Sequence, residues 1–305
     1  MNILFSSTIE PAERWLPLLQ AVLPEDRFYT EADDRADIAL IASPPPGTLE
    51  KLKGARLIQS LWMGVEKLIE DPALPRHVPL ARLADPGMVA AMSETVLAHT
   101  LDWHRRLYGY RAQQREARWK RFRQYMASDH TVGLLGLGEL GTDAARKLRF
   151  LGFNVCGWSR RPRSLDEVEC FSGMDGLDRT LRNSDVVVCL LPLTPQTEGI
   201  LNRENLLKVK KGGALINVAR GGHVVRDDLI AALDSGHLAH AYLDVFETEP
   251  LPADDPLWRH PGVTITPHAA ALTEPRTAVH KIAANIECIR RGTLPPNLVD
   301  FSAGY

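Results

Sequence analysis

The sequence predicts an α/β protein built on a doubly wound parallel sheet, together with a second, smaller α/β domain. Three observations predict this fold. Short apolar stretches alternate with helical segments along almost all of the 305 residues. A glycine-rich turn, Gly136-x-Gly138-x-x-Gly141, lies between one apolar strand and one helix. A separate α/β pattern fills residues 1–95, ahead of that turn. Strands that alternate with helices in this way form parallel sheets with right-handed crossovers.

The first 95 residues are predicted to hold a helix over Ala12–Val22 and four strands, which are Ile3–Ser6, Ile38–Ala42, Leu57–Ser60 and Pro79–Leu83. The segment Leu61-Trp62-Met63-Gly64-Val65 directly follows the third of these strands. A glycine in that place can present backbone amides to an anion. An ordinary turn explains the spacing equally well, so both interpretations stay open.

A long helix is predicted over Met88–Arg106, with apolar residues on more than one face. Such a helix suits a connection between two domains or a contact with a partner chain. Residues 105–123 then combine eight basic with four aromatic side chains. That mixture can bind nucleic acid. The formal net charge of −2 favours instead a solvated or interface helix, or one that steers anionic ligands.

Residues 131–161 contain every part of a βαβ unit. An apolar strand begins at Thr131, the glycine turn and a helix follow, and a second apolar strand covers Phe153–Trp158. The first glycine permits the tight turn, the second lets backbone approach a pyrophosphate, and the third lets the helix pack on the strand. This context predicts a Rossmann-type dinucleotide site, because the free amides at a helix start favour an anion. The expected phosphate-binding residues are Gly136, Gly138, Glu139, Leu140 and Gly141.

The end of the second strand indicates which dinucleotide binds. An NAD site usually carries an acidic residue there, whereas this chain has Ser159-Arg160-Arg161. Two guanidinium groups and a hydroxyl suit a 2′-phosphate, so we expect NADP, with weaker binding of NAD. The alternative is a solvated basic turn, to which the nearby Arg163 would also belong.

The α/β alternation continues to the end of the chain. Further strands are predicted at Val186–Leu190, Ala214–Val218, His240–Asp244 and Val263–Thr266, with a helix over Arg226–Leu233. A final helix is predicted to begin at Thr273 as its N-cap, with Pro275 in the first turn, and to end at Gly292.

Polar residues gather where these strands end, and ligands of parallel sheets bind outside the carboxyl ends of the strands. The residues at these ends are Leu191-Pro192, Ala219-Arg220, Asp244 with Glu249, and Pro267-His268. Arg220 can fork onto a substrate carboxylate and polarise a neighbouring carbonyl, while His268 can protonate the alkoxide that hydride transfer creates. Either carboxylate could orient the histidine.

Structural roles are the competing interpretation for these four residues. Arg220 could close a salt bridge and His268 could be a buried, hydrogen-bonded histidine. Glu249 could belong to a solvated acidic loop, and Asp244 could cap a turn. The other strand-end candidates, Leu191, Pro192 and Ala219, are expected to contact the cofactor.

Five stretches of the chain together resemble the D-isomer-specific 2-hydroxyacid dehydrogenases. They are Gly136-Leu-Gly138-Glu-Leu-Gly141, Asn217-Val-Ala-Arg220-Gly, Leu243-Asp244-Val-Phe, Glu249-Pro-Leu-Pro and Thr266-Pro-His268-Ala-Ala. The resemblance implies that Arg220, Glu249 and His268 are catalytic, with Glu249 paired to the histidine. It also implies that Asp244 contacts the nicotinamide amide and that Trp62, Met63 and Gly64 bind substrate.

The same resemblance implies a flavodoxin-like substrate domain made from residues 1–95 and 273–305, a dinucleotide-binding domain over 96–272, and a homodimer. Within the family, several stretches are similar to the glyoxylate/hydroxypyruvate reductase A branch, which prefers NADPH. They are Cys156-Gly-Trp158-Ser159-Arg160, Arg82-Leu83 with Gly87-Met88, and the terminal Gly304-Tyr305. Glu66 departs from the pattern, because many members of the family carry Asp there.

The expected activity is therefore the reduction of glyoxylate or hydroxypyruvate with NADPH. A reductase of bulkier 2-oxoacids, or a non-catalytic protein that senses the cofactor on the same fold, is the alternative.

The composition and the cysteine spacing predict a cytoplasmic protein without a nucleic-acid or membrane partner. The 45% hydrophobic and 24% charged content is typical of soluble globular proteins. No apolar stretch has the length of a membrane span, and the amino terminus has no basic leader. The cysteines are widely spaced, which favours buried thiols over a disulfide or metal site, and they are Cys156, Cys170, Cys189 and Cys288.

Overall fold

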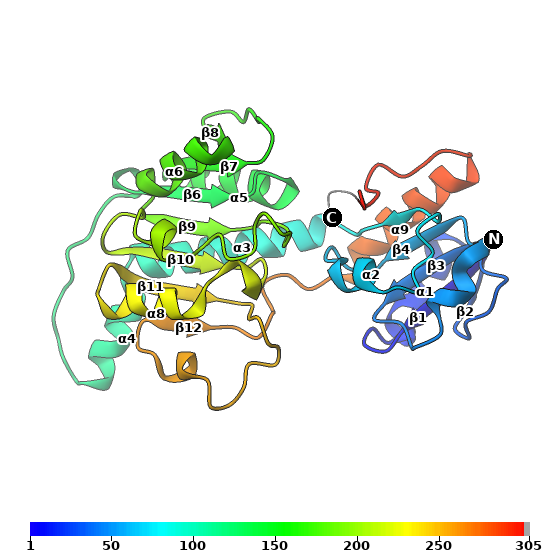
Figure 1. Cartoon of the computed structure of the whole chain (residues 1–305), viewed down its shortest axis with the longest axis horizontal. Coiled ribbons are helices and arrows are strands. Elements are labelled where there is room, and N and C mark those ends of the chain that lie inside the picture. Colours follow the sequence, from blue (N-terminus) through cyan, green and yellow to red (C-terminus); the bar gives the residue numbers. More distant parts are fainter. Residues whose placement is uncertain (302–305) are drawn as a thin grey trace. The chain divides into compact units, whose positions relative to one another are not determined.

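The computed structural model describes residues 1–301, so Gly304 and Tyr305 lie outside the described residues. The chain divides into two compact units (Figure 1). The smaller unit contains residues 1–88 and the segment that begins at Leu272, and the larger unit is Val89–Ala271.

The smaller unit is built on a parallel sheet of five strands. In sheet order these are β2 (Arg27–Tyr29), β1 (Asn2–Ser7), β3 (Ile38–Ala42), β4 (Leu57–Ser60) and β5 (Leu80–Ala81). The order 2-1-3-4-5 is that of flavodoxin-like folds. Helices α1 (Ala12–Val22) and α9 (Pro275–Arg290) share one apolar cluster with the sheet, and α2 (Glu66–Glu70) and the 3-10 helix η1 (Leu49–Gly54) share the other.

The larger unit is built on a parallel sheet of seven strands, in the order β12-β11-β10-β9-β6-β7-β8. Their bounds are Thr131–Leu135 (β6), Asn154–Ser159 (β7), Glu169–Ser172 (β8), Val186–Cys189 (β9), Gly213–Asn217 (β10), Leu238–Leu243 (β11) and Val263–Ile265 (β12). Numbered from β6, the order contains the 3-2-1-4-5-6 arrangement of dinucleotide-binding folds, which confirms the predicted fold class. The chain reverses direction across the sheet between β6 and β9, where such folds bind their ligands.

Helices cover both faces of this larger sheet (Figure 1). Helices α3 (Pro86–His104) and α5 (Glu139–Phe150) belong to one apolar cluster, in which Val132, Val186 and Ile216 supply strand residues. The opposite cluster contains residues of α6 (Gly173–Asn183), α7 (Arg203–Leu206) and α8 (Arg226–Asp234). Two layers of helices on one sheet leave its carboxyl edge as the place where polar side chains collect.

Three local predictions were wrong. The long helix does not reach Arg106, because that residue adopts a positive φ of 59° and separates α3 from the short helix α4 (Leu107–Arg115). The basic stretch is therefore not one helix, and no regular element is assigned to residues 116–126.

The third error concerns the last helix. Its N-cap is Glu274, whose carboxylate accepts a hydrogen bond from the Arg276 backbone N–H, whereas the Thr273 hydroxyl donates to the Leu61 carbonyl.

No helix among residues 1–301 is long and apolar enough to span a bilayer.

Candidate active site

The glycine turn between β6 and α5 is shaped by close contacts of backbone with backbone. Gly136 has a positive φ of 109°, and a Cβ there would lie 2.9 Å from the Leu190 carbonyl oxygen. A Cβ on Gly141 would lie 1.9 Å from the Gly136 carbonyl oxygen. Gly138, the N-cap of α5, faces open space instead, since a Cβ there would meet nothing within 4 Å. The turn thus leaves room for a phosphate at the helix start, as a dinucleotide requires.

The basic residues at the end of β7 lie on the surface. Arg160 and Arg161 are exposed, and the Ser159 hydroxyl donates a 2.7 Å hydrogen bond to the Arg161 carbonyl. That bond folds the chain back at the strand end. Both arginines come directly after β7, which pairs with β6, the strand that leads into the glycine turn. In dinucleotide-binding folds the adenosine ribose binds at the end of this second strand.

Arg220 follows β10 and is held by its own turn. The buried Asn217 side chain donates to the Arg220 carbonyl at 2.9 Å and accepts from the Ala219 N–H at 3.2 Å. The next residue, Gly221, packs directly on the loop after β11, because a Cβ there would lie 1.9 Å from the Phe246 carbonyl carbon. Only glycine permits this approach, which brings the arginine turn against the loop that carries Glu249.

The side chains of Glu249 and His268, which lie on two different loops, are in hydrogen-bond contact. The distance from the Glu249 Oε2 atom to the His268 Nδ1 atom is 2.7 Å. The other carboxylate oxygen, Oε1, accepts a 2.9 Å hydrogen bond from the Phe246 backbone N–H. The carboxylate is thereby fixed, and it orients the imidazole so that Nε2 is the ring nitrogen left for a reacting group.

Asp244 does not make this contact with the imidazole and instead organises the loop that carries it. The aspartate is 2% exposed, and its carboxylate accepts bonds from the Thr266 hydroxyl at 2.5 Å and from the Ala269 and Ala270 amides at 2.9 and 3.0 Å. Its backbone carbonyl accepts from the His268 N–H at 2.8 Å. His268 has a positive φ of 53°, a backbone conformation that residues other than glycine rarely adopt unless neighbouring groups stabilise it. Asp244 supplies that support.

The loop after β9 is joined to the arginine turn by a histidine. His223 is fully buried, with Nδ1 3.0 Å from the Arg220 carbonyl oxygen and Nε2 3.2 Å from the Pro192 carbonyl oxygen. Leu191 and Pro192 follow β9 at the carboxyl edge, beside the glycine turn. His223 is not among the candidate residues that the sequence indicates, and its place three residues after Arg220 is the signal that could have connected the two.

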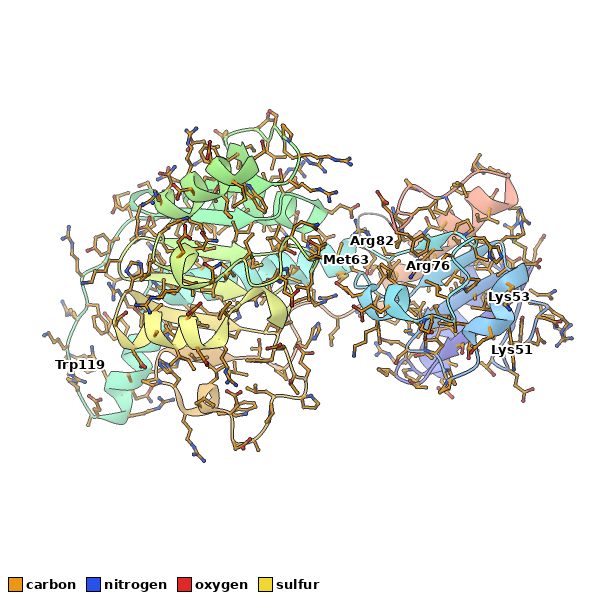
Figure 2. All side chains as sticks on the ribbon, viewed as in Figure 1. Lys51, Lys53, Met63, Arg76, Arg82 and Trp119 are labelled. Atoms are coloured by element: carbon orange, nitrogen blue, oxygen red, sulfur yellow. The ribbon has the colours of Figure 1, made fainter. Side chains whose placement is uncertain are left out.

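In the smaller unit, the predicted substrate loop follows β4. The Trp62 N–H donates to the Ser60 hydroxyl at 3.0 Å, and its carbonyl accepts from the Leu83 N–H at 3.0 Å. Met63 and Gly64 come next and are partly exposed (Figure 2 labels Met63). The loop thus lies at the carboxyl edge of its own parallel sheet, where anions and other ligands bind.

Among residues 1–301, no three or more His, Cys, Asp or Glu side chains are grouped so that they could hold a metal ion.

Comparison with known proteins gives consistent results. A sequence model described as "D-isomer specific 2-hydroxyacid dehydrogenase, NAD binding domain" matches residues 97–270. Two proteins named glyoxylate/hydroxypyruvate reductase A, from Serratia proteamaculans and Photorhabdus laumondii, are 42% and 40% identical to this chain, and each alignment covers both proteins completely.

Solved structures that resemble this chain belong to the same group of proteins. A D-isomer specific 2-hydroxyacid dehydrogenase from Xanthobacter autotrophicus Py2, in complex with NADPH and MES, has a TM-score of 0.96 at 40% identity, covering 100% of this chain and 99% of the other. An NADPH-dependent glyoxylate/hydroxypyruvate reductase from Sinorhizobium meliloti, in complex with NADP and sulfate, has a TM-score of 0.93 at 34% identity, with the same coverage.

Proposed function

Because this chain belongs to the family of D-isomer specific 2-hydroxyacid dehydrogenases, we propose that it reduces small 2-oxoacids to 2-hydroxyacids with NADPH. Glyoxylate and hydroxypyruvate are the proposed substrates, as in the names of its relatives. The observation that carries the proposal is the 2.7 Å contact between Glu249 and His268. The loop with Glu249 packs against the turn that carries Arg220, and the glycine turn lies at the same edge of the sheet.

NADPH supplies the hydride when it is bound. We assign its phosphates to the glycine turn with Glu139 and Leu140, and its 2′-phosphate to Ser159, Arg160 and Arg161. The residues after β9 and β10, which are Leu191, Pro192 and Ala219, complete the proposed cofactor site. We also assign the nicotinamide end to the neighbourhood of Asp244.

Three side chains of the larger unit carry the proposed chemistry. Arg220 donates N–H groups to the substrate carboxylate and carbonyl, a geometry that the planar guanidinium provides and an ammonium does not. His268 gives the Nε2 proton to the substrate oxygen as the carbonyl becomes an alkoxide. Glu249, fixed by the Phe246 N–H, stabilises the positive charge on the ring before that transfer.

The smaller unit is proposed to bind the substrate carboxylate through Trp62, Met63 and Gly64, because backbone amides after a strand can hold an anion. In this assignment residues 1–95 and 273–305 form the substrate domain, and residues 96–272 form the dinucleotide-binding domain.

A panel assay tests the function directly. The purified protein is mixed with NADPH and, separately, with glyoxylate, hydroxypyruvate, pyruvate or phenylpyruvate, and loss of NADPH absorbance is followed. We expect turnover of the first two substrates and loss of turnover in His268→Gln. Preferred turnover of phenylpyruvate would favour a reductase of bulkier acids. NADPH binding without turnover of any substrate would favour a cofactor-sensing protein.

We further propose that the protein is a homodimer joined through the segment after α4. Trp119 lies within this segment, is 98% exposed and points away from the unit (Figure 2). Residues of α4 and the segment line a groove beside it, including Tyr110, Gln113 and Arg118. An isolated indole with this exposure is typical of an aromatic anchor that a partner protein covers, and a second copy of this chain is the proposed partner.

Light scattering at micromolar concentration tests the dimer. Trp119→Ala should weaken association by roughly thirtyfold, the usual minimum for an aromatic anchor, without unfolding the monomer. Met174→Ala removes another exposed apolar side chain, on α6, and should leave the dimer intact. A monomer mass for the parent protein would refute the proposal.

We also propose a cytoplasmic location. Cys156, Cys170, Cys189 and Cys288 are all free thiols, which suits a reducing compartment. Fractionation of cells that express the tagged protein would test this.

A further inference from the structure

One carboxylate of the smaller unit holds two indole rings. Glu10 lies in the loop between β1 and α1, and its Oε2 atom accepts a 3.1 Å hydrogen bond from Trp15 Nε1. Its Oε1 atom accepts a 3.1 Å hydrogen bond from Trp62 Nε1. An indole has a single N–H donor and a carboxylate has two accepting oxygens, so each donor is matched with one oxygen.

The two tryptophans differ in their freedom to move. Trp15 is 0% exposed, belongs to the apolar cluster of α1 and α9, and packs against Phe5 with ring centroids 6.2 Å apart. Trp62 is only partly buried at the edge of that cluster and begins the predicted substrate loop. A core ring therefore fixes Glu10 from one side, and Glu10 in turn fixes the indole of the more exposed ring.

The loop that carries Glu10 is itself fixed. The Ser7 hydroxyl at the end of β1 accepts hydrogen bonds from the Ile9 N–H at 3.1 Å and the Glu10 N–H at 2.7 Å. The carboxylate is thus set by its own backbone as well as by Trp15. Without Glu10, the Trp62 indole would keep a fixed backbone but could turn to other staggered rotamers.

We propose that Glu10 is a specificity-determining residue, which limits the reaction to small 2-oxoacids by holding the Trp62 indole in one position beside the substrate-binding amides. This inference rests on the proposed function. A fixed indole next to Met63 and Gly64 leaves space for the hydrogen of glyoxylate or the hydroxymethyl group of hydroxypyruvate. A benzyl substituent, as in phenylpyruvate, needs the indole to move.

The test compares kcat/KM for hydroxypyruvate and phenylpyruvate in the parent protein and in Glu10→Ala. A charge-assisted hydrogen bond at a partly exposed site biases a conformation by about tenfold. The ratio of the two kcat/KM values should therefore shift about tenfold toward phenylpyruvate, mainly through KM. Glu13→Ala removes an exposed carboxylate of α1 and is the matched control, with an unchanged ratio expected.

A double-mutant cycle separates positioning from general destabilisation. Trp62→Phe keeps an aromatic ring but removes the N–H, so it should shift the ratio as well, and adding Glu10→Ala to it should cause no further shift. Glu10→Gln, whose single amide oxygen can satisfy only one indole, serves if the alanine variant does not fold. Near-ultraviolet circular dichroism of the free protein should lose tryptophan intensity in both Glu10 variants.

An unchanged ratio in Glu10→Ala and Glu10→Gln would overturn the inference and leave the proposed function intact. An equal shift when Glu10→Ala is added to Trp62→Phe would also overturn it, because the effect would then not pass through the Trp62 indole. Failure of the parent protein to reduce either substrate would overturn the proposed function together with the inference.

Discussion

Replacement of Glu249 by glutamine separates the charge of this side chain from its shape. In the structure one carboxylate oxygen contacts His268 Nδ1 at 2.7 Å and the other accepts from the Phe246 N–H at 2.9 Å. A glutamine has one oxygen for these two donors and presents an NH₂ group to the other. The variant therefore either loses the carboxylate acceptor at the ring, or keeps a neutral acceptor there and leaves the Phe246 N–H without its own.

The expected loss follows from this geometry. A hydrogen bond to a charged group contributes roughly 1.5–3 kcal/mol. The His268 and Glu249 side chains are 51% and 35% exposed, so water competes for the contact and the lower end applies. About 1.5 kcal/mol of lost transition-state stabilisation lowers kcat/KM about tenfold. His268→Gln removes the proton donor itself and should cost on the order of 10²–10⁴.

Steady-state kinetics with NADPH and hydroxypyruvate, for the parent and the variants, measure these losses. Glu247→Gln makes the same chemical change two residues away, on an exposed side chain, and should leave kcat/KM unchanged. The reasoning would be refuted if Glu249→Gln were as active as the parent. It would also be refuted if Glu247→Gln lost as much activity, because the effect would then reflect the charge of the loop.

Four further predictions concern the cofactor, the substrate, the loop contact and stability. Arg160→Ala should weaken NADPH about tenfold to a hundredfold in a fluorescence titration and leave NADH nearly unchanged; equal losses would argue against a 2′-phosphate contact. Arg220→Lys should lower kcat/KM by at least tenfold, because an ammonium cannot bind carboxylate and carbonyl together, and kinetics near those of the parent would contradict this role. Gly221→Ala should lower kcat without changing NADPH affinity, since the new Cβ would displace the Phe246 backbone; unchanged kcat would contradict the contact. Burial lowers the pKa of His240 from 6.5 to about 4. The contribution of the neutral ring to the free energy of unfolding should therefore be fully present above pH 6.5 and fall by about 3 kcal/mol as the pH drops to 4. An equal pH slope in denaturant melts of His240→Gln would refute this assignment.

Much of the fold could be predicted because its strands are continuous apolar runs. Ile38–Ala42 and Leu57–Ser60 are buried along their whole length, and the structure gives these strands the predicted bounds. The edge strands Arg27–Tyr29 and Glu169–Ser172 were missed, since each is short and partly exposed. Helix Gly173–Asn183 was missed as well, because two glycines, one of them at its first position, weaken the helical pattern.

Backbone contacts explain the errors near α3 and α9. The residue type of Arg106 does not predict a left-handed conformation. This conformation lets α4 turn back, so that the rings of Tyr108 and His240 stack with their centroids 4.6 Å apart. Thr273 is a stronger N-cap than Glu274 by residue preference. Tertiary structure reverses that preference, because the Thr273 hydroxyl is used by the Leu61 carbonyl of a distant loop.

The carboxylate partner of His268 could not be chosen from spacing, because Asp244 and Glu249 both follow β11. The structure separates them by the donors that each one meets. Asp244 is buried, and its two oxygens face the Thr266 hydroxyl and two backbone amides, so it has little capacity left for a side chain. Glu249 meets one amide through one oxygen and retains the other for the imidazole. The buried acid therefore sets the backbone of the histidine loop, including the positive φ of His268, while the more exposed acid sets the direction of the ring. Removal of Asp244 would displace the histidine, whereas removal of Glu249 would leave the backbone of the histidine loop in place and take away only the acceptor at Nδ1. Only the second change therefore isolates the chemistry of the pair.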